Sequence, residues 1–325
     1  MAYDRIDPAA IRVRPLSDRN DLIQIEQAAC DPSASPPELT NDQLRASIGR
    51  LVQQMRSARQ AGRSIMITYG AHLVKNGAGP LLNALIEDGW VTHLATQGAG
   101  IIHDWEFAFQ GHSSESVADN APVGRFGIWD ETGRWLNRAA VEGRARDEGW
   151  GESLGRLIND NPADHPYRRY SITATAHSRR VPLCVMPGIG YDIYCCHPDF
   201  DGGAIGEVAQ RDFYTFVDGV QQLDGGVYLS VGSAIMSPQV FEKAFSIANN
   251  LRQGRGEAFL ADHYLGIVDI QDGGGWDWTI GEPPMDHPAY YLRFCKSFYR
   301  MGGTVDYLQA DNRLVLAHLV RALCE

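Results

Sequence analysis

The hydrophobic positions of this chain fall into short runs with two different periods. Residues 41–62, NDQLRASIGRLVQQMRSARQAG, carry apolar side chains three and four positions apart and end at Gly62, which predicts an amphipathic helix. The run SIMITYG at 64–70 is a compact apolar block, which is typical of a strand covered on both faces. GPLLNALIEDG at 79–89 predicts a short helix, and VTHLAT at 91–96 predicts another strand. A strand, a helix and a strand in succession predict a βαβ unit, because parallel strands need a crossover connection.

The alternation of strands and helices resumes towards the end of the chain. We predict further strands at 181–187, 226–233, 265–271 and 303–308, and helices at 206–223, 237–251, 288–302 and 312–324. The helix at 237–251 is expected to have Ser237 as its N-cap and Pro238 as its first residue. The whole pattern predicts an α/β fold with a doubly wound, Rossmann-like parallel sheet in a single large domain at 41–325.

Two regions depart from this alternation. Residues 1–40 are irregular and rich in proline, and we interpret them as an N-terminal arm. Residues 112–170 have weaker periodicity, with a helix predicted within 127–145 and a long loop at 156–170. We interpret this region as an insertion or a lid over one end of the sheet. The arm and the first helix either pack on a neighbouring copy, giving a homo-oligomer (dimer or tetramer), or cover their own sheet.

The composition narrows the class of protein. The chain has 325 residues, of which 44% are hydrophobic, enough for a large core. No run approaches the roughly 18 apolar residues of a membrane helix, and the first residues lack a signal core, so we expect a cytoplasmic protein without membrane partners. A net charge of −11 disfavours nucleic-acid binding.

The six cysteines show no C-x-x-C spacing and are expected to be reduced thiols. Chemistry that needs an amine has only three candidates, Lys75, Lys243 and Lys296.

Nearly all the segments that leave the predicted strands are rich in glycine. They include Gly70 after the first strand, QGAG at 97–100 after the second, and VGS at 231–233. In a parallel sheet these segments meet at one edge, where backbone N–H groups can approach a phosphate or a ribose. The sequence therefore predicts a small-molecule cleft at this edge.

Acidic side chains and one histidine follow the same strands. The acids are Asp104, Glu106, Asp201, Asp272 and Asp277. A carboxylate-lined pocket favours an amine through charge complementarity, and His103 is the candidate acid or base because its pKa lies nearest neutrality. No spacing of histidines and acids indicates a metal site, and we expect no metal. G-x-G-x-x-G, a P-loop and a G-x-S-x-G elbow are all missing from the sequence.

Several of these segments, in this order, resemble those of the deoxyhypusine synthase family. LATQGAGIIHD at 94–104 is similar to the family's strand, glycine turn and acidic residues, and FDGGAIGEV at 200–208 to its Asp-Gly-Ser-Ile-Gly turn. VYLSVGSAIMSPQVF at 227–241, LGIVDIQDGGGWDW at 265–278 and VDYLQADNRLVLAHLV at 305–320 resemble its later strands and turns. The block around 70–106 also resembles the NAD-binding part of an archaeal-type ornithine cyclodeaminase of this fold.

The resemblance implies an NAD site, a small substrate and a homotetrameric assembly. It assigns cofactor contacts to Gly70, Gly98, Ala99, Gly100, Gly232, Ser233, Ala310 and Asp311. It implies that Asp201 helps to hold the substrate, and that His103 and Asp104 occupy the place of an acidic pair, which makes these three the candidate catalytic residues.

One departure from the family changes the expected reaction. The family forms an imine on a lysine before the last strand, whereas residues 273–293, GGGWDWTIGEPPMDHPAYYLR, contain no lysine. An arginine cannot form this imine, so hypusine formation is not expected. The leading hypothesis is an NAD-dependent transferase, oxidoreductase or lyase acting on a small cationic or amino-acid-like substrate. The alternatives are a non-catalytic protein, and a protein that binds another nucleotide or a sugar phosphate.

Overall fold

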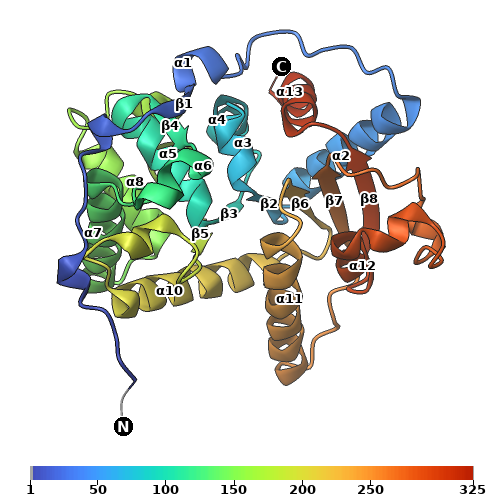
Figure 1. The fold of residues 1–325 in the computed structure, drawn as a ribbon. Helices are drawn as coiled ribbons and strands as arrows, with labels where there is room; N and C mark the ends of the chain where they lie inside the picture. The colour runs from blue at the N-terminus through green and yellow to red at the C-terminus, as the bar shows by residue number, and fades with distance from the viewer. Residues whose placement is uncertain (1–2, 325) are drawn as a thin grey trace.

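The molecule is built on a parallel sheet, seen in a computed structural model that describes residues 3–324 (Figure 1). The strands of this sheet are β2 (Ile65–Tyr69), β3 (His93–Gln97), β5 (Leu183–Met186), β6 (Gly226–Val231), β7 (His263–Asp269) and β8 (Thr304–Gln309). Their order across the sheet is β5-β3-β2-β6-β7-β8, and each neighbouring pair is parallel. Numbered along the chain, these six strands have the order 3-2-1-4-5-6 of dinucleotide-binding folds, so the predicted doubly wound α/β sheet is confirmed.

The helices of this chain range from one turn to about five turns in length. They are α1 (Ile25–Ala28), α2 (Asp42–Gln60), α3 (Ala71–Lys75), α4 (Gly79–Glu87), α5 (Gly98–Gln110), α6 (Val117–Asn120), α7 (Asp130–Arg146), α8 (Trp150–Asp160), α9 (Ile172–Arg179), α10 (Gly202–Gln221), α11 (Met236–Gly254), α12 (Arg293–Tyr299) and α13 (Asn312–Leu323). None of the described helices is long and apolar enough to cross a membrane.

The core lies on both faces of the sheet, because alternate side chains of each strand point to opposite sides. On one face, Ile67 and its neighbours pack against α2, α4 and α13, as the buried Leu51 of α2 illustrates. On the other face, Tyr228 packs against Phe241 of α11 and Phe298 of α12. Figure 1 shows α10, α11 and α12 on one side of the sheet, with α4 and α13 on the other.

The region at 112–170 packs against the β5 end of the molecule. Its strand β4 (His112–Glu115) pairs antiparallel with β1 (Asp21–Gln24) of the arm, and its helices α7 and α8 contact α10. This part of the arm therefore packs on its own chain, whereas residues 3–10 are exposed and extend away from the body (Figure 1). Residues 1, 2 and 325, which the predicted arm and domain include, lie outside the described residues.

Three predicted elements differ from the observed ones. The predicted loop at 156–170 begins inside α8, so its first part was wrong. Ser237 is not an N-cap and Pro238 is not the first helical residue, because α11 begins at Met236. The Ser237 hydroxyl instead bonds to that of Tyr228 at 2.9 Å. The predicted helix at 288–302 is broken near Leu292 into a 3-10 turn and α12.

Candidate functional site

A cavity of about 210 Å³ lies where the strands β2, β3 and β5 end. Its lining includes Lys75 at the end of α3, Ala99 and His103 of α5, and Asp192 from the segment after β5. The arm supplies Arg19, so segments that are distant in the sequence meet here. The predicted location of a cleft, beyond the carboxyl ends of the strands, agrees with this cavity.

His103 is held in one tautomer by a chain of hydrogen bonds. The Ser113 hydroxyl donates to the Glu106 carboxylate at 2.5 Å, so Ser113 can only accept from Nδ1 of His103, which lies 2.8 Å away. Nδ1 therefore carries the proton, and Nε2 keeps its lone pair. Burial lowers the pKa of His103 to about 4, and the nearby charge of Lys75 acts in the same direction. The imidazole is therefore neutral at pH 7, with an unprotonated Nε2 on the side chain that lines the cavity. The expectation that the pKa of His103 lies near neutrality was wrong, because burial disfavours the charged ring.

The Glu106 carboxylate that orients this chain is fully neutralised. Arg19 donates to both of its oxygens, at 2.8 and 2.7 Å, and Thr132 donates at 2.8 Å. The side chains of Arg19 and Glu106 are each 1% exposed. Arg19 holds the pKa of Glu106 below its ordinary value against the effect of burial. Glu106 is thus a positioning group, and it offers no free charge to a ligand.

Lys75 is an unpaired cation in the lining of the cavity, which also contains the acids Glu115 and Asp192. It has no hydrogen-bond or ion-pair partner in the part of the chain that the structure describes. The other two lysines lie elsewhere: Lys243 pairs with Glu242 at 3.1 Å, and the ammonium of Lys296 sits 3.6 Å from the centre of the Tyr290 ring. Of the three amines in the sequence, Lys75 is therefore the one placed beside His103.

The N-terminus of α5, predicted to face a phosphate, is occupied by a carboxylate of the chain itself. Asp192 is 5% exposed and accepts from the backbone of Ala99 and from Gly188 at 2.8 Å. A Cβ on Gly98 would lie 2.1 Å from its Oδ2, and a Cβ on Gly100 would lie 2.1 Å from Thr96 Oγ1. Gly98 and Gly100 therefore permit close packing within the protein. A further anion does not fit here while Asp192 holds this place.

The switch point of the sheet lies between β2 and β6, where Gly70 and Gly232 touch. A Cβ on Gly70 would lie 2.1 Å from the carbonyl oxygen of Gly232. Gly232 itself has a φ of +58°, and a Cβ there would meet only Asn312 Nδ2 at 4.0 Å. The backbone at Gly232 is thus open to a ligand. Ser233 is buried, and its hydroxyl accepts from Ser237 N at the start of α11.

Asn312, the first residue of α13, provides a second sign of a ligand at the switch point. It is 8% exposed, and its Oδ1 has no hydrogen-bond partner within residues 3–324. Next to it, Ala310 continues the sheet ladder, and Asp311 caps α13 and pairs with Arg313 at 2.8 Å. Gly232 and Asn312 thus lie together beyond the ends of β6 and β8.

The other predicted acids are engaged in the fold. Asp104 is 1% exposed and caps α9, accepting from Ser171 Oγ at 2.6 Å. Asp201 caps α10 and pairs with Arg144 at 3.3 Å. Asp272 and Asp277 each accept backbone N–H groups within the loop after β7. None of these four lines the His103 cavity.

The sequence analysis named Lys75 only as one of three candidate amines, and it did not identify Arg19, Ser113 or Asp192. Lys75 stood in the glycine-rich segment after the first strand, so its position at the sheet edge was a usable signal. Arg19 and Ser113 gave no signal, because the pairing of β1 with β4 brings them to Glu106.

Comparison with known proteins shows the fold. No family model matches the chain, and no curated protein matches its sequence. Among solved structures, unliganded AgrE matches with a TM-score of 0.54 at 15% identity, covering 89% of this chain and 34% of AgrE. The chain thus spans about a third of AgrE, which has also been crystallised with ornithine and NAD+.

Two further solved structures match over most of this chain. A LOR/SDH protein from Methanococcus maripaludis S2 has a TM-score of 0.51 at 15% identity, covering 90% of this chain and 70% of its own. A protein assigned as a deoxyhypusine synthase from Entamoeba histolytica has a TM-score of 0.49 at 11% identity, covering 87% and 89%. The fold that the resemblance implies is confirmed by the matches to AgrE and to the LOR/SDH protein.

Proposed function

We propose that this protein binds NAD or a related nucleotide at the carboxyl edge of its sheet, and acts on a small amino-acid-like substrate in the His103 cavity. The observation that carries the proposal is a neutral histidine with an unprotonated Nε2, beside an unpaired ammonium, near the switch point of a dinucleotide-binding strand order. AgrE, which has this fold, has been crystallised with ornithine and NAD+, and this adds support.

The charges of the cavity suit a substrate that carries both a carboxylate and an amine. Lys75 is unpaired in the described chain, and the acids Glu115 and Asp192 line the same cavity without a cation partner among the described residues. An amino acid could place its carboxylate on Lys75 and present an acidic N–H or C–H to Nε2 of His103.

Some residues of the two sites bind the ligands, and others take part in the reaction. Lys75 binds and orients the substrate, His103 removes a proton, and Ser113 with Glu106 keeps His103 in the required tautomer. At the switch point, Gly232 and Asn312 would hold the nucleotide. NAD, when bound, would supply a hydride acceptor for oxidation of the substrate carbon. Hypusine formation is not proposed, because residues 273–293 contain no lysine.

Calorimetric titration with NAD, ADP-ribose and AMP tests the nucleotide site. We expect NAD to bind and Asn312→Leu to weaken it about tenfold, or ~1.4 kcal/mol. Because Oδ1 of Asn312 has no partner among the described residues, this variant should unfold at the same denaturant concentration or higher. His103→Gln is the matched control and should bind NAD as the wild type does. If none of the three nucleotides binds at millimolar concentration, the proposal is wrong.

The second candidate is a non-catalytic protein that binds a nucleotide or a sugar phosphate. The observation in its favour is Asp192 at the N-terminus of α5, where a dinucleotide phosphate was expected. Binding of a sugar phosphate in place of NAD, with no turnover of amino acids, would favour this candidate.

A further inference from the structure

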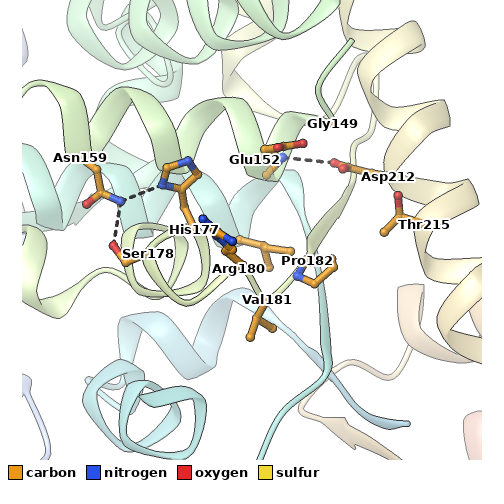
Figure 2. A pocket seen from close by; sticks show the side chains of 12 residues that line it. Gly149, Glu152, Asn159, His177, Ser178, Arg180, Val181, Pro182, Asp212 and Thr215 are labelled. Carbon is orange, nitrogen blue, oxygen red and sulfur yellow. Dashed lines mark hydrogen bonds between the residues drawn. The ribbon is translucent and has the colours of Figure 1, made fainter. Parts of the chain in front are cut away.

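A second and larger cavity, of about 810 Å³, lies beside the edge strand β5, away from His103. Figure 2 shows it between α8, α9 and α10, with the segment from Arg180 to Pro182 running along one wall. Its volume is within the range of small-molecule sites. None of the residues assigned above to the substrate or the nucleotide lines it.

Asp212 of α10 supplies a buried carboxylate with one free oxygen. The side chain is 4% exposed, and Oδ2 accepts from the backbone N–H groups of Trp150, Gly151 and Val185 at 3.1, 3.2 and 2.9 Å. These donors belong to the start of α8 and to the free edge of β5. Within the described chain no donor reaches Oδ1, although Asp212 lines the cavity. Burial raises the pKa of Asp212 to about 7, and the acid Glu152 lines the same cavity. In its ionised form this oxygen can accept from a protonated amine, whose charge favours that form.

Two donors for an anion lie on the other walls. The guanidinium of Arg180 has no hydrogen-bond or ion-pair partner in residues 3–324, and in Figure 2 it lies between His177 and Asp212. His177 also lines the cavity, with its Nδ1 3.1 Å from Asn159 Nδ2, and its Nε2 has no hydrogen-bond partner within residues 3–324, so the Nε2–H form of the ring can donate to an anion.

The backbone at Arg180 gives a further reason to look for a ligand. Arg180 closes α9 in the left-handed conformation, with a φ of +56°, where glycine is the favoured residue. Keeping an arginine here costs free energy, and the described chain offers its guanidinium no partner in return.

We propose that this cavity binds a second small molecule, an α-amino acid with an apolar side chain. Its ammonium binds Oδ1 of Asp212, and its carboxylate binds Arg180 and Nε2 of His177. The apolar side chain lies against Val181, Pro182 and Leu183, which line the same cavity. Because this site shares no residue with the His103 cavity, it stands independently of the proposed function.

Titration calorimetry with three matched probes tests this proposal: L-phenylalanine, 3-phenylpropionate, which lacks the amine, and phenethylamine, which lacks the carboxylate. We expect L-phenylalanine to bind at least tenfold more tightly than either analogue. Arg180→Gly and Asp212→Asn should each weaken its binding at least tenfold. Glycine suits the left-handed position, and asparagine keeps an oxygen for the three N–H groups, so both variants should fold.

Two control variants separate this site from its surroundings. Arg179→Ala removes the neighbouring arginine, which does not line the cavity, and His103→Gln alters the other cavity. Both should bind L-phenylalanine as the wild type does. The proposal is overturned if L-phenylalanine does not bind, if either analogue binds equally well, or if Arg180→Gly leaves its affinity unchanged.

Discussion

At the scale of single residues, the buried pair of Arg19 and Glu106 makes the sharpest prediction about stability. Both side chains are 1% exposed, so loss of the Glu106 charge leaves the guanidinium with Asp21 as its one carboxylate partner among the described residues. We expect Glu106→Gln to lower the free energy of unfolding by about 3–5 kcal/mol, measured by urea denaturation. The double variant with Arg19→Met should recover part of this loss. A Glu106→Gln protein as stable as the wild type would contradict the pairing.

His103 makes a prediction about pH. Burial, with help from the charges of Lys75 and Arg19, lowers its pKa from 6.5 to about 4. The unfolded chain therefore takes up this proton first, so the stability that rests on neutral His103 is complete above pH 6.5 and is lost as the pH falls to 4. Nitrogen-15 NMR should show the Nδ1–H tautomer at pH 7 and a midpoint near 4. Ser113→Ala should mix the tautomers, and an unchanged spectrum would contradict the role given to Ser113.

At the scale of elements, the end of α9 predicts a gain in stability. Arg180 holds a φ of +56°, and Val181 N donates to Ala176 O in the pattern that glycine usually completes. Arg180→Gly should raise the free energy of unfolding by about 1 kcal/mol, because the left-handed region costs other residues about 1–2 kcal/mol. Arg180→Ala keeps this cost and serves as the control. Equal melting temperatures for the two variants would contradict the argument.

The spacing of apolar residues along the chain predicted those helices and strands whose buried side chains recur at regular intervals. The predicted helix at 41–62 matches α2, with Asn41 as N-cap, and the predicted strands match those of the parallel sheet. The apolar pattern did not predict α8, because this helix contains glycines where it packs closely on β5. A Cβ on Gly151 would lie 1.8 Å from the carbonyl oxygen of Leu183. Glycine weakens a helical pattern, and only the packed neighbour explains its presence.

The candidate site was less predictable than the sheet, because it depends on contacts between residues that are distant in the sequence. The position of His103 follows from local order, since it lies one turn inside the helix after β3. Its chemistry depends on Ser113 and Arg19, and Arg19 lies 87 residues before Glu106. Such contacts form only when the arm pairs with β4, so no local pattern encodes them.

At the scale of the whole molecule, the carboxyl edge of the sheet exposes apolar side chains. Tyr191, Ile235, Ile270 and Met285 are each between 72% and 75% exposed and follow the ends of β5, β6 and β7. Apolar side chains that gather at one edge favour contact with another protein surface, and the homo-oligomer stays a prediction in which these four residues lie in the interface. In the arm, β1 pairs with β4 of the same chain, and α2 contacts β6 and β8, so these elements cover their own sheet and body.

Light scattering coupled to size exclusion measures the assembly directly. We expect a mass that is two or four times the 35.9 kDa of one chain. Ile270→Asp combined with Met285→Asp should shift this mass to that of one chain, because two charges would be buried without partners in the interface. Tyr214→Asp is the matched control, since Tyr214 is also exposed but lies on α10, away from the ends of these strands. A wild-type mass of 35.9 kDa at micromolar concentration would show that the exposed edge serves another purpose.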